Sequence, residues 1–287
     1  MKQVILWLKI LCLFVFMGRA WQHLRWDAPY RAFFWSEAIL SPVFKLMGWS
    51  WQHYVTHSDI YIANGIKVIG VFLLIAALCS LLASPKSRLP RFVLPISGVL
   101  LIILALMYSK EKGFYIGEFI EYGAQVACPW LLYATVYRPN FTLVRLKLGL
   151  KIAIALTFLG HGLYAIGYYP VPGIFQQMMV NTFGFSEMAA KQWLYIAGVL
   201  DIAVAVGIFL PYLKTPLLVY AAVWGFITAL ARIVANYDAN IPAYSIDLWL
   251  FEVLYRLPHG GLPLLLLFMN YKIIDETTPN HSLPDKG

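Results

Sequence analysis

Long apolar segments separated by short polar loops dominate this chain. Eight segments of about 18 to 24 residues contain few charges, and each is long enough to cross the roughly 30 Å hydrocarbon core of a bilayer as a helix. They comprise residues 3–20, 60–83, 91–108, 118–137, 147–168, 189–210, 216–236 and 248–271. Hydrocarbon offers a backbone no hydrogen-bond partners, and the segments are too long for barrel strands. We therefore predict an all-α integral membrane protein with about eight transmembrane helices.

Two stretches between the predicted spans differ from ordinary turns. Residues 29–49 and 172–185 each begin with proline and contain a glycine near their end, which predicts short amphipathic helices at the membrane interface after spans one and five. The first stretch lies in a segment rich in Trp, Tyr and Phe, a composition typical of the headgroup region. A quinone or lipid-tail pocket is the alternative interpretation of the same aromatic residues.

Basic residues concentrate in the loops that follow spans two, four and six. These residues are Lys86, Arg88, Arg91, Arg138, Arg145, Lys147 and Lys214. Because cytoplasmic loops carry the excess of Lys and Arg, these loops should face the cytoplasm, and so should both termini.

Composition agrees with a membrane protein, because 61% of the residues are hydrophobic and 13% are charged. The net charge of +8 requires no nucleic-acid partner, since basic cytoplasmic loops and anionic headgroups account for it. The three cysteines are isolated, which argues against a disulfide-exchange enzyme. No tight pattern of metal-ligand spacings is present, and we predict no metal site. A signal peptide is the alternative interpretation of the first apolar segment.

The two halves of the chain resemble each other. Residues 6–24, 63–74 and 118–129 align in order with residues 148–166, 200–211 and 252–263. The alignments pair Arg19 with His161, Asn64 with Asp201, Gly70 with Gly207, Glu118 with Glu252, and Gln125 with His259. We predict two parallel four-helix repeats, residues 1–140 and 141–272, followed by a polar, disordered tail at 273–287. A ligand site is expected between the repeats.

Ionisable side chains inside the predicted spans are the candidates for function. A charged group at the bilayer centre costs roughly 2.5–3.5 kcal/mol, so these groups should face the bundle, pair with one another or line a wet cavity. Most lie in the outer half of their spans. With two polar neighbours, the candidates for ligand binding or proton relay are Arg19, His23, Lys67, Glu118, Glu121, Gln125, His161, Asp201, Arg232, Glu252, Arg256 and His259.

Spacing places some of these residues on common helical faces. Steps of three and four residues relate Glu118, Glu121 and Gln125 in the fourth span, and Glu252, Arg256 and His259 in the eighth. In the eighth span, Pro258 and Pro263 flank two glycines, which should interrupt the helix and expose carbonyl groups beside His259.

Each candidate also has a structural interpretation. Glu118 and Glu121 could cap a helix N-terminus, where carboxylates are favourable. Arg19 and Lys67 could extend toward the headgroups along their apolar stems. His161 could be a helix-packing histidine bonded to a backbone carbonyl.

A family resemblance follows from particular motifs. The first span of each half ends in glycine beside a polar residue, GRA at Gly18 and GHG at Gly160. A proline-containing amphipathic stretch follows, and then GVLDIAVAVGIFL at residues 198–210. This pattern resembles the DoxX-type membrane family, with two four-helix units fused in one chain. A more distant similarity is to the horizontally transferred transmembrane domain of vitamin K-dependent carboxylases and their bacterial relatives.

The resemblance implies a quinone-linked redox role in a bacterial cytoplasmic membrane, because DoxX-like proteins include a subunit of thiosulfate:quinone oxidoreductase. It implies a quinone as the ligand and a membrane or periplasmic redox partner. Arg19, His161 and His259 would then bind an anionic substrate or a quinone carbonyl, and Glu118, Asp201 or Glu252 would relay protons. The alternatives are a transporter or receptor that binds a small solute or lipid between the repeats, and a polar network that only stabilises the bundle.

Overall fold

The computed structural model describes residues 1–277, and their side chains as far as residue 271. Within this part the chain forms helices and no strand, which confirms the all-α prediction. The longer helices are α1 (Lys2–Arg25), α4 (Trp51–Leu82), α5 (Arg88–Glu111), α8 (Leu143–Ala165), α10 (Glu187–Gly207), α11 (Lys214–Val234) and α12 (Pro242–Thr277). The shorter helices are α2 (Arg31–Phe34), α3 (Glu37–Met47), α6 (Ile116–Glu121), α7 (Gly123–Tyr137) and α9 (Gly173–Phe183).

Apolar helices identify an integral membrane protein. Among the described residues, five helices are long and apolar enough to cross a membrane: α1, α4, α5, α10 and α11. Their outward surfaces expose large apolar side chains, such as Val68 on α4, Phe92 on α5 and Val223 on α11. Apolar surface of this extent is stable against acyl chains and would be unfavourable in water.

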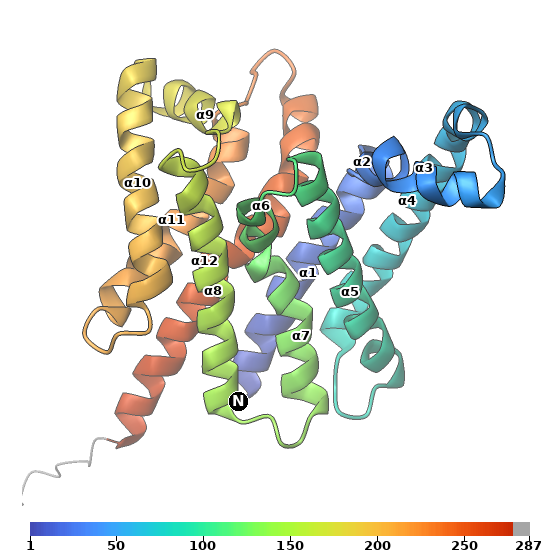
Figure 1. The fold of residues 1–287 in the computed structure, drawn as a ribbon. Helices are drawn as coiled ribbons and strands as arrows, with labels where there is room; N and C mark the ends of the chain where they lie inside the picture. Colours follow the sequence, from blue (N-terminus) through green and yellow to red (C-terminus); the bar gives the residue numbers. More distant parts are fainter. Residues whose placement is uncertain (278–287) are drawn as a thin grey trace, which may run out of the picture.

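The helices form one bundle around α1 and α12 (Figure 1). Helix α1 packs against α4, α7 and α12, and α8 packs against α6, α7, α10 and α12. Figure 1 shows α2, α3 and α9 at one end of the bundle. The loops that follow α4, α7 and α10 lie at the opposite end, where the N-terminus also lies. Short helices therefore occur at both predicted positions, and the three basic loops share one end.

The fourth predicted span is divided, contrary to the expectation of one helix. Helix α6 ends at Glu121 and α7 begins at Gly123, with Tyr122 between them. The backbone N–H of Ala124 donates to Thr157 Oγ1 at 2.8 Å, so it is diverted from the helical ladder to a side chain of α8. A contact between distant segments thus produces a break that local sequence did not predict.

The eighth predicted span shows the opposite result. Helix α12 continues through Pro258 and Pro263, so the predicted interruption is wrong. Helix α11 packs closely here, because a Cβ on Gly225 would lie 2.5 Å from the backbone carbonyl carbon of His259. Close packing by a neighbour can hold a proline-containing helix together. Helix α12 also extends five residues into the predicted tail, and residues 278–287 lie outside the described part.

Two glycines allow helices of different halves to approach closely. A Cβ on Gly18 in α1 would lie 2.8 Å from the backbone nitrogen of Tyr255 in α12. A Cβ on Gly160 in α8 would lie 2.8 Å from the backbone nitrogen of Glu121 in α6. The sequence alignment pairs Gly18 with Gly160, so aligned positions make the same kind of contact.

Another pair of glycines corrects part of that alignment. A Cβ on Gly70 would lie 2.9 Å from Leu24 Cγ, and a Cβ on Gly198 would lie 2.8 Å from Ile166 Cγ2. Since Leu24 aligns with Ile166, the contact partner of Gly70 in the second half is Gly198. The sequence alignment had instead paired Gly70 with Gly207.

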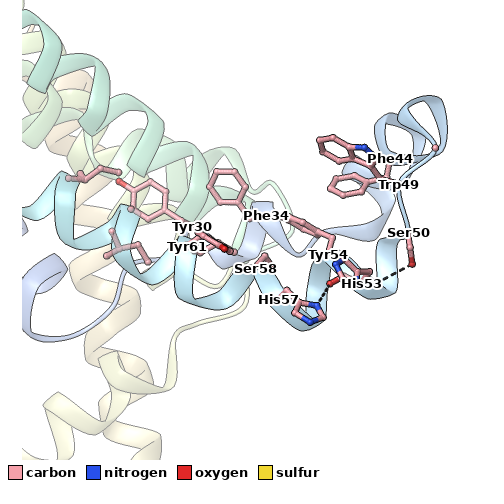
Figure 2. Close-up of a pocket in the computed structure, with 15 residues that line it drawn as sticks. Tyr30, Phe34, Phe44, Trp49, Ser50, His53, Tyr54, His57, Ser58 and Tyr61 are labelled. Carbon is pink, nitrogen blue, oxygen red and sulfur yellow. Dashed lines mark hydrogen bonds between the residues drawn. The ribbon is translucent and has the colours of Figure 1, made fainter.

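The N-terminal part of α4 extends beyond the bundle beside α2 and α3. Helix α4 has 32 residues, or about 48 Å at 1.5 Å per residue, which exceeds the roughly 30 Å hydrocarbon core. A groove of about 860 Å³ lies along this extension. Figure 2 shows its aromatic lining, including Tyr30, Phe34, Trp49 and Tyr61. The aromatic residues predicted as a headgroup belt therefore also line a groove.

Candidate functional site

A cavity of about 260 Å³ lies between α8, α9, α10, α11 and α12. Most of its wall is apolar, with Phe158, Phe175, Met178 and Trp224 among the lining residues. Its polar lining consists of His161, Thr182, Asp201, Thr228, Arg232, Arg256 and His259. Three further lining residues, Phe183, Leu230 and Val234, are exposed on the outer surface of the bundle. The cavity therefore reaches the surface that faces the acyl chains.

Three polar atoms in this cavity have no hydrogen-bond partner. They are Thr182 Oγ1, Arg232 Nε and His259 Nε2, and they are the only buried side-chain nitrogen or oxygen atoms in the described part that lack one. All three residues line the cavity. Buried polar groups are nearly always satisfied, because an unmade hydrogen bond costs about 1–3 kcal/mol. Their convergence on one cavity indicates a missing partner.

A carboxylate bridges two arginines beside the cavity. Glu252 Oε2 lies 2.8 Å from Arg256 Nη1 and 3.4 Å from Arg232 Nη1. Both arginines line the cavity, whereas Glu252 does not. Two cationic groups therefore share one anionic partner at this wall, and the face they turn to the cavity is cationic.

His161 connects the cavity to the first half of the chain. Its Nδ1 lies 3.6 Å from Glu121 Oε2 of α6, and its ring centroid is 5.2 Å from that of His259. A carboxylate beside an imidazole can orient the ring and accept or release a proton. The contacts of His161 are thus with side chains, which differs from the predicted alternative of a histidine bonded to a carbonyl.

Asp201 lies toward the other end of the cavity. Its carboxylate accepts a hydrogen bond of 3.1 Å from the Tyr220 hydroxyl. Tyr220 and Arg232 are twelve residues apart on α11, a distance of about 18 Å along the helix axis. The partnered carboxylate is therefore separated from the arginines, and the cavity has one cationic end.

Arg19 occupies a different, closely packed site. Its side chain is fully buried, so the predicted extension toward the headgroups is wrong. Nη2 donates to Gln125 Oε1 at 2.7 Å and Nη1 to Gln22 Oε1 at 2.8 Å. The guanidinium carbon lies 3.6 Å from the ring centroid of Tyr255. This arginine is satisfied by amide oxygens and aromatic faces, and it does not line the cavity.

Other predicted site residues have structural partners or lie apart. His23 Nδ1 is 2.6 Å from the Arg19 carbonyl oxygen. Glu118 lies in the first turn of α6, as the capping interpretation expected, and its Oε2 accepts from the Tyr164 hydroxyl at 3.0 Å. Lys67 is exposed on α4, so the structure does not bring it to the other candidates.

The break at Tyr122 also divides the polar stripe predicted for the fourth span. Glu118 contacts Tyr164, Glu121 faces His161, and Gln125 accepts from Arg19. The first two side chains turn toward α8 and the third toward α1. The residues are buried together as expected, but they serve different partners.

Several residues of the polar network were not predicted. Tyr164, Tyr220 and Tyr255 contact charged groups, although sequence alone assigns tyrosine more readily to the headgroup region. A usable signal was spacing, because Tyr164 follows His161 by three residues on the same helix. Thr182 had no such signal, since α9 was expected to lie on the surface.

The fold and its apolar helices define an all-α integral membrane protein. The model of the DoxX-like family matches residues 155–250, about a third of the chain, which supports the resemblance predicted from the sequence. The matched segment contains every residue that lines the cavity except Arg256 and His259. No curated protein and no solved structure gives a significant match to the chain.

Proposed function

We propose that this protein is a quinone-linked redox protein or subunit, and that the cavity between α8 and α12 binds the quinone ring. The observation that carries the proposal is the convergence of Thr182 Oγ1, Arg232 Nε and His259 Nε2, all without partners, on one largely apolar cavity. A quinone combines an apolar ring with carbonyl oxygens that accept hydrogen bonds. Arginine and threonine donate such bonds, and histidine donates from Nε2 in one tautomer.

The size and position of the cavity suit a ring with a tail. Its volume of about 260 Å³ is just below the range of roughly 300–1,000 Å³ for ligand pockets, so it would take the ring alone. The exposed rim residues Phe183, Leu230 and Val234 give an apolar tail a route to the acyl chains.

Proton transfer is assigned to the pair formed by His161 and Glu121. Oxidation of a quinol to a quinone releases two protons and two electrons. His161 lines the cavity and would accept the two protons in turn, one with each electron, and Glu121, 3.6 Å from His161, would carry each of them toward α6. The electrons would pass to a membrane or periplasmic redox partner.

The proposed architecture is eight spans in two parallel repeats, residues 1–140 and 141–272. The supporting observations are the matching contacts of Gly18 and Gly160 and the short helices that follow the first long helix of each half, α2 and α3 after α1 and α9 after α8. With the basic loops at the end where the N-terminus lies (Figure 1), both termini would be cytoplasmic in a bacterial cytoplasmic membrane. Helices α2, α3 and α9 would then lie at the outer interface.

The alternative is a transporter or receptor with its site between the repeats. The cavity is lined by residues of the second half alone, from Phe158 to His259. Contacts between the halves are instead close, as at Gly18 and Gly160. The quinone proposal therefore fits the location of the cavity better.

Quinone binding tests the proposal directly. The purified protein in nanodiscs is titrated with short-chain quinones, and a lipid extract is analysed for quinone by absorbance and mass spectrometry. We expect saturable binding, weakened about tenfold in His259→Leu, which removes one hydrogen bond. The control Lys67→Met alters an exposed residue of α4 and should bind as the parent does. Absence of co-purified quinone together with absence of binding would refute the proposal, and solute accumulation in proteoliposomes would favour the transporter.

A further inference from the structure

We infer that the cavity binds its quinone-type ligand as an anion, such as an ionised hydroxyquinone or a quinol anion. This inference rests on the proposed function and specifies its ligand class. It is carried by the excess of cationic groups at one end of the cavity, and by two buried nitrogen atoms of its lining residues that have no hydrogen-bond partner.

The first step is the charge of the wall. Within the described residues, the charged groups that line the cavity are Arg232, Arg256 and Asp201. The two arginines share a single carboxylate, Glu252, at 3.4 and 2.8 Å. A pair of guanidinium groups with one carboxylate leaves a net charge of about +1 at this end.

The second step is the position of the other carboxylates. Asp201 accepts from Tyr220 at 3.1 Å, and Tyr220 is twelve residues from Arg232 on α11, or about 18 Å along the axis. Glu121 faces His161 at 3.6 Å and does not line the cavity. Among the described residues, neither carboxylate forms an ion pair with the two arginines, and Glu121 attracts them only at longer range.

The third step is the geometry of the free donors. Arg232 is 6% exposed, and its Nε has no hydrogen-bond partner. His259 is 4% exposed, and its Nε2 also has none. An ionised oxygen that accepts from such donors forms charge-assisted hydrogen bonds, which are roughly twice as strong as neutral ones.

The membrane setting decides between an anionic and a neutral ligand. A neutral carbonyl would satisfy the donors but leave the excess positive charge in a region of low dielectric constant, where unpaired charge is costly. A ligand with one negative charge would satisfy the donors and balance the wall together. We therefore assign the cationic end to the ionised oxygen and the apolar walls to the ring.

A matched pair of ligands tests this assignment. The probes are 2-hydroxy-1,4-naphthoquinone, which is ionised at neutral pH, and its neutral analogue 2-methoxy-1,4-naphthoquinone. Each is titrated into the protein in nanodiscs of zwitterionic lipid, and binding is followed by the quinone absorbance. We expect the ionised probe to bind at least about tenfold more tightly than the neutral probe.

Two variants should change the preference for the ionised probe in opposite directions. A merely structural role of these residues would not produce such opposite changes. Glu252→Gln removes the carboxylate that the two arginines share, so it should increase the preference for the ionised probe. Arg232→Gln removes one cation and the free Nε, so it should abolish that preference. If Glu252→Gln fails to fold, the Arg232 variant and the probe pair still decide, with folding checked by thermal unfolding.

The outcomes separate this inference from the proposed function. Equal or tighter binding of the neutral probe to the parent protein would overturn the anion assignment while leaving quinone binding in place. Binding of neither probe would overturn both. A lower preference for the ionised probe in Glu252→Gln would also overturn the assignment, because it would show that the local excess charge is not cationic.

Discussion

Two buried positions that the sequence aligns, Arg19 and His161, have similar neighbours and different surroundings. Within the first half, Arg19 donates to Gln125 at 2.7 Å. Within the second half, the ring of His161 lies 5.2 Å from the ring of His259. Gln125 aligns with His259, so the same two positions meet in each half.

The correspondence extends to contacts between the halves. Arg19 lies over the ring of Tyr255 at 3.6 Å, and His161 lies 3.6 Å from the carboxylate of Glu121. The offset that relates Gln125 to His259 also relates Glu121 to Tyr255. A shared backbone arrangement thus carries a packed polar network on one side and a chemically reactive pair on the other.

The surroundings differ in how completely the donors are used. All three guanidinium nitrogens of Arg19 donate hydrogen bonds, and no atom of the residue lines the cavity. His161 lines the cavity, and its neighbour His259 keeps an unpartnered nitrogen. Complete satisfaction is what a stabilising buried charge requires, and incomplete satisfaction marks a place for a ligand.

The largest expected effect is the loss of Arg19. Arg19→Met leaves Gln125 and Gln22 without their donor in a buried site, which should lower the free energy of unfolding by about 3 kcal/mol. Arg232→Met removes a longer contact beside an open cavity and should cost less in the absence of ligand. Thermal unfolding of both variants in detergent measures the difference. If Arg232→Met lowers the thermal stability as much as Arg19→Met does, the distinction between a packed site and an open site is contradicted.

A smaller effect is expected at the close contacts between the halves. Gly18→Ala and Gly160→Ala would each place a Cβ 2.8 Å or less from backbone atoms of the facing helix. The helices must then separate, at a cost of roughly 1–3 kcal/mol. Gly65→Ala is the control, since nothing lies within 4 Å of its Cβ position. Similar losses of stability in the first two variants, measured by thermal unfolding, would support the equivalence of the two positions. Unchanged stability in both variants would mean that these contacts are not close, and the repeat proposal would lose that support.

Local sequence was sufficient for the helices and for the burial of most candidate charges. Apolar length and the cost of ionised groups in hydrocarbon apply residue by residue, so Arg19, Asp201 and Arg232 were expected inside the bundle, where they are found. The same argument placed Lys67 inside the bundle, and this prediction is wrong because the residue is exposed on α4. A long flexible stem can carry an ammonium group to a polar region, so the cost of its position is lower.

The pairing of side chains and the cavity could not be predicted in this way. Glu121 meets His161 across two helices of different halves, and no local pattern specifies that neighbour. The break before Gly123 depends on a hydrogen bond from Ala124 to Thr157 in another helix. The cavity depends on the volumes of side chains from five helices, including α9, whose packing against the bundle was not evident from its amphipathic sequence.

The smallest predicted effect concerns two threonines, one with a partner and one without. Replacing them should change the stability of the protein in opposite directions. Thr157 Oγ1 accepts from the Ala124 N–H at 2.8 Å, whereas Thr182 Oγ1 has no partner. Thr157→Val should therefore destabilise the protein by about 1 kcal/mol, because a buried N–H loses its acceptor. Thr182→Val removes an unsatisfied hydroxyl at constant shape and should stabilise the ligand-free protein by roughly 0.5–1 kcal/mol.

Bound quinone should offset the stability that Thr182→Val gains in the ligand-free protein. With a quinone bound, the parent hydroxyl gains an acceptor, so Thr182→Val should gain less thermal stability on addition of ligand than the parent does. Thr157 does not line the cavity, so Thr157→Val should gain as much thermal stability on addition of ligand as the parent does. Thermal unfolding of the parent and of both variants, each with and without quinone, measures the six values. If Thr182→Val destabilises the ligand-free protein, its hydroxyl is satisfied without ligand, and the cavity loses one of the three donors on which the quinone proposal rests.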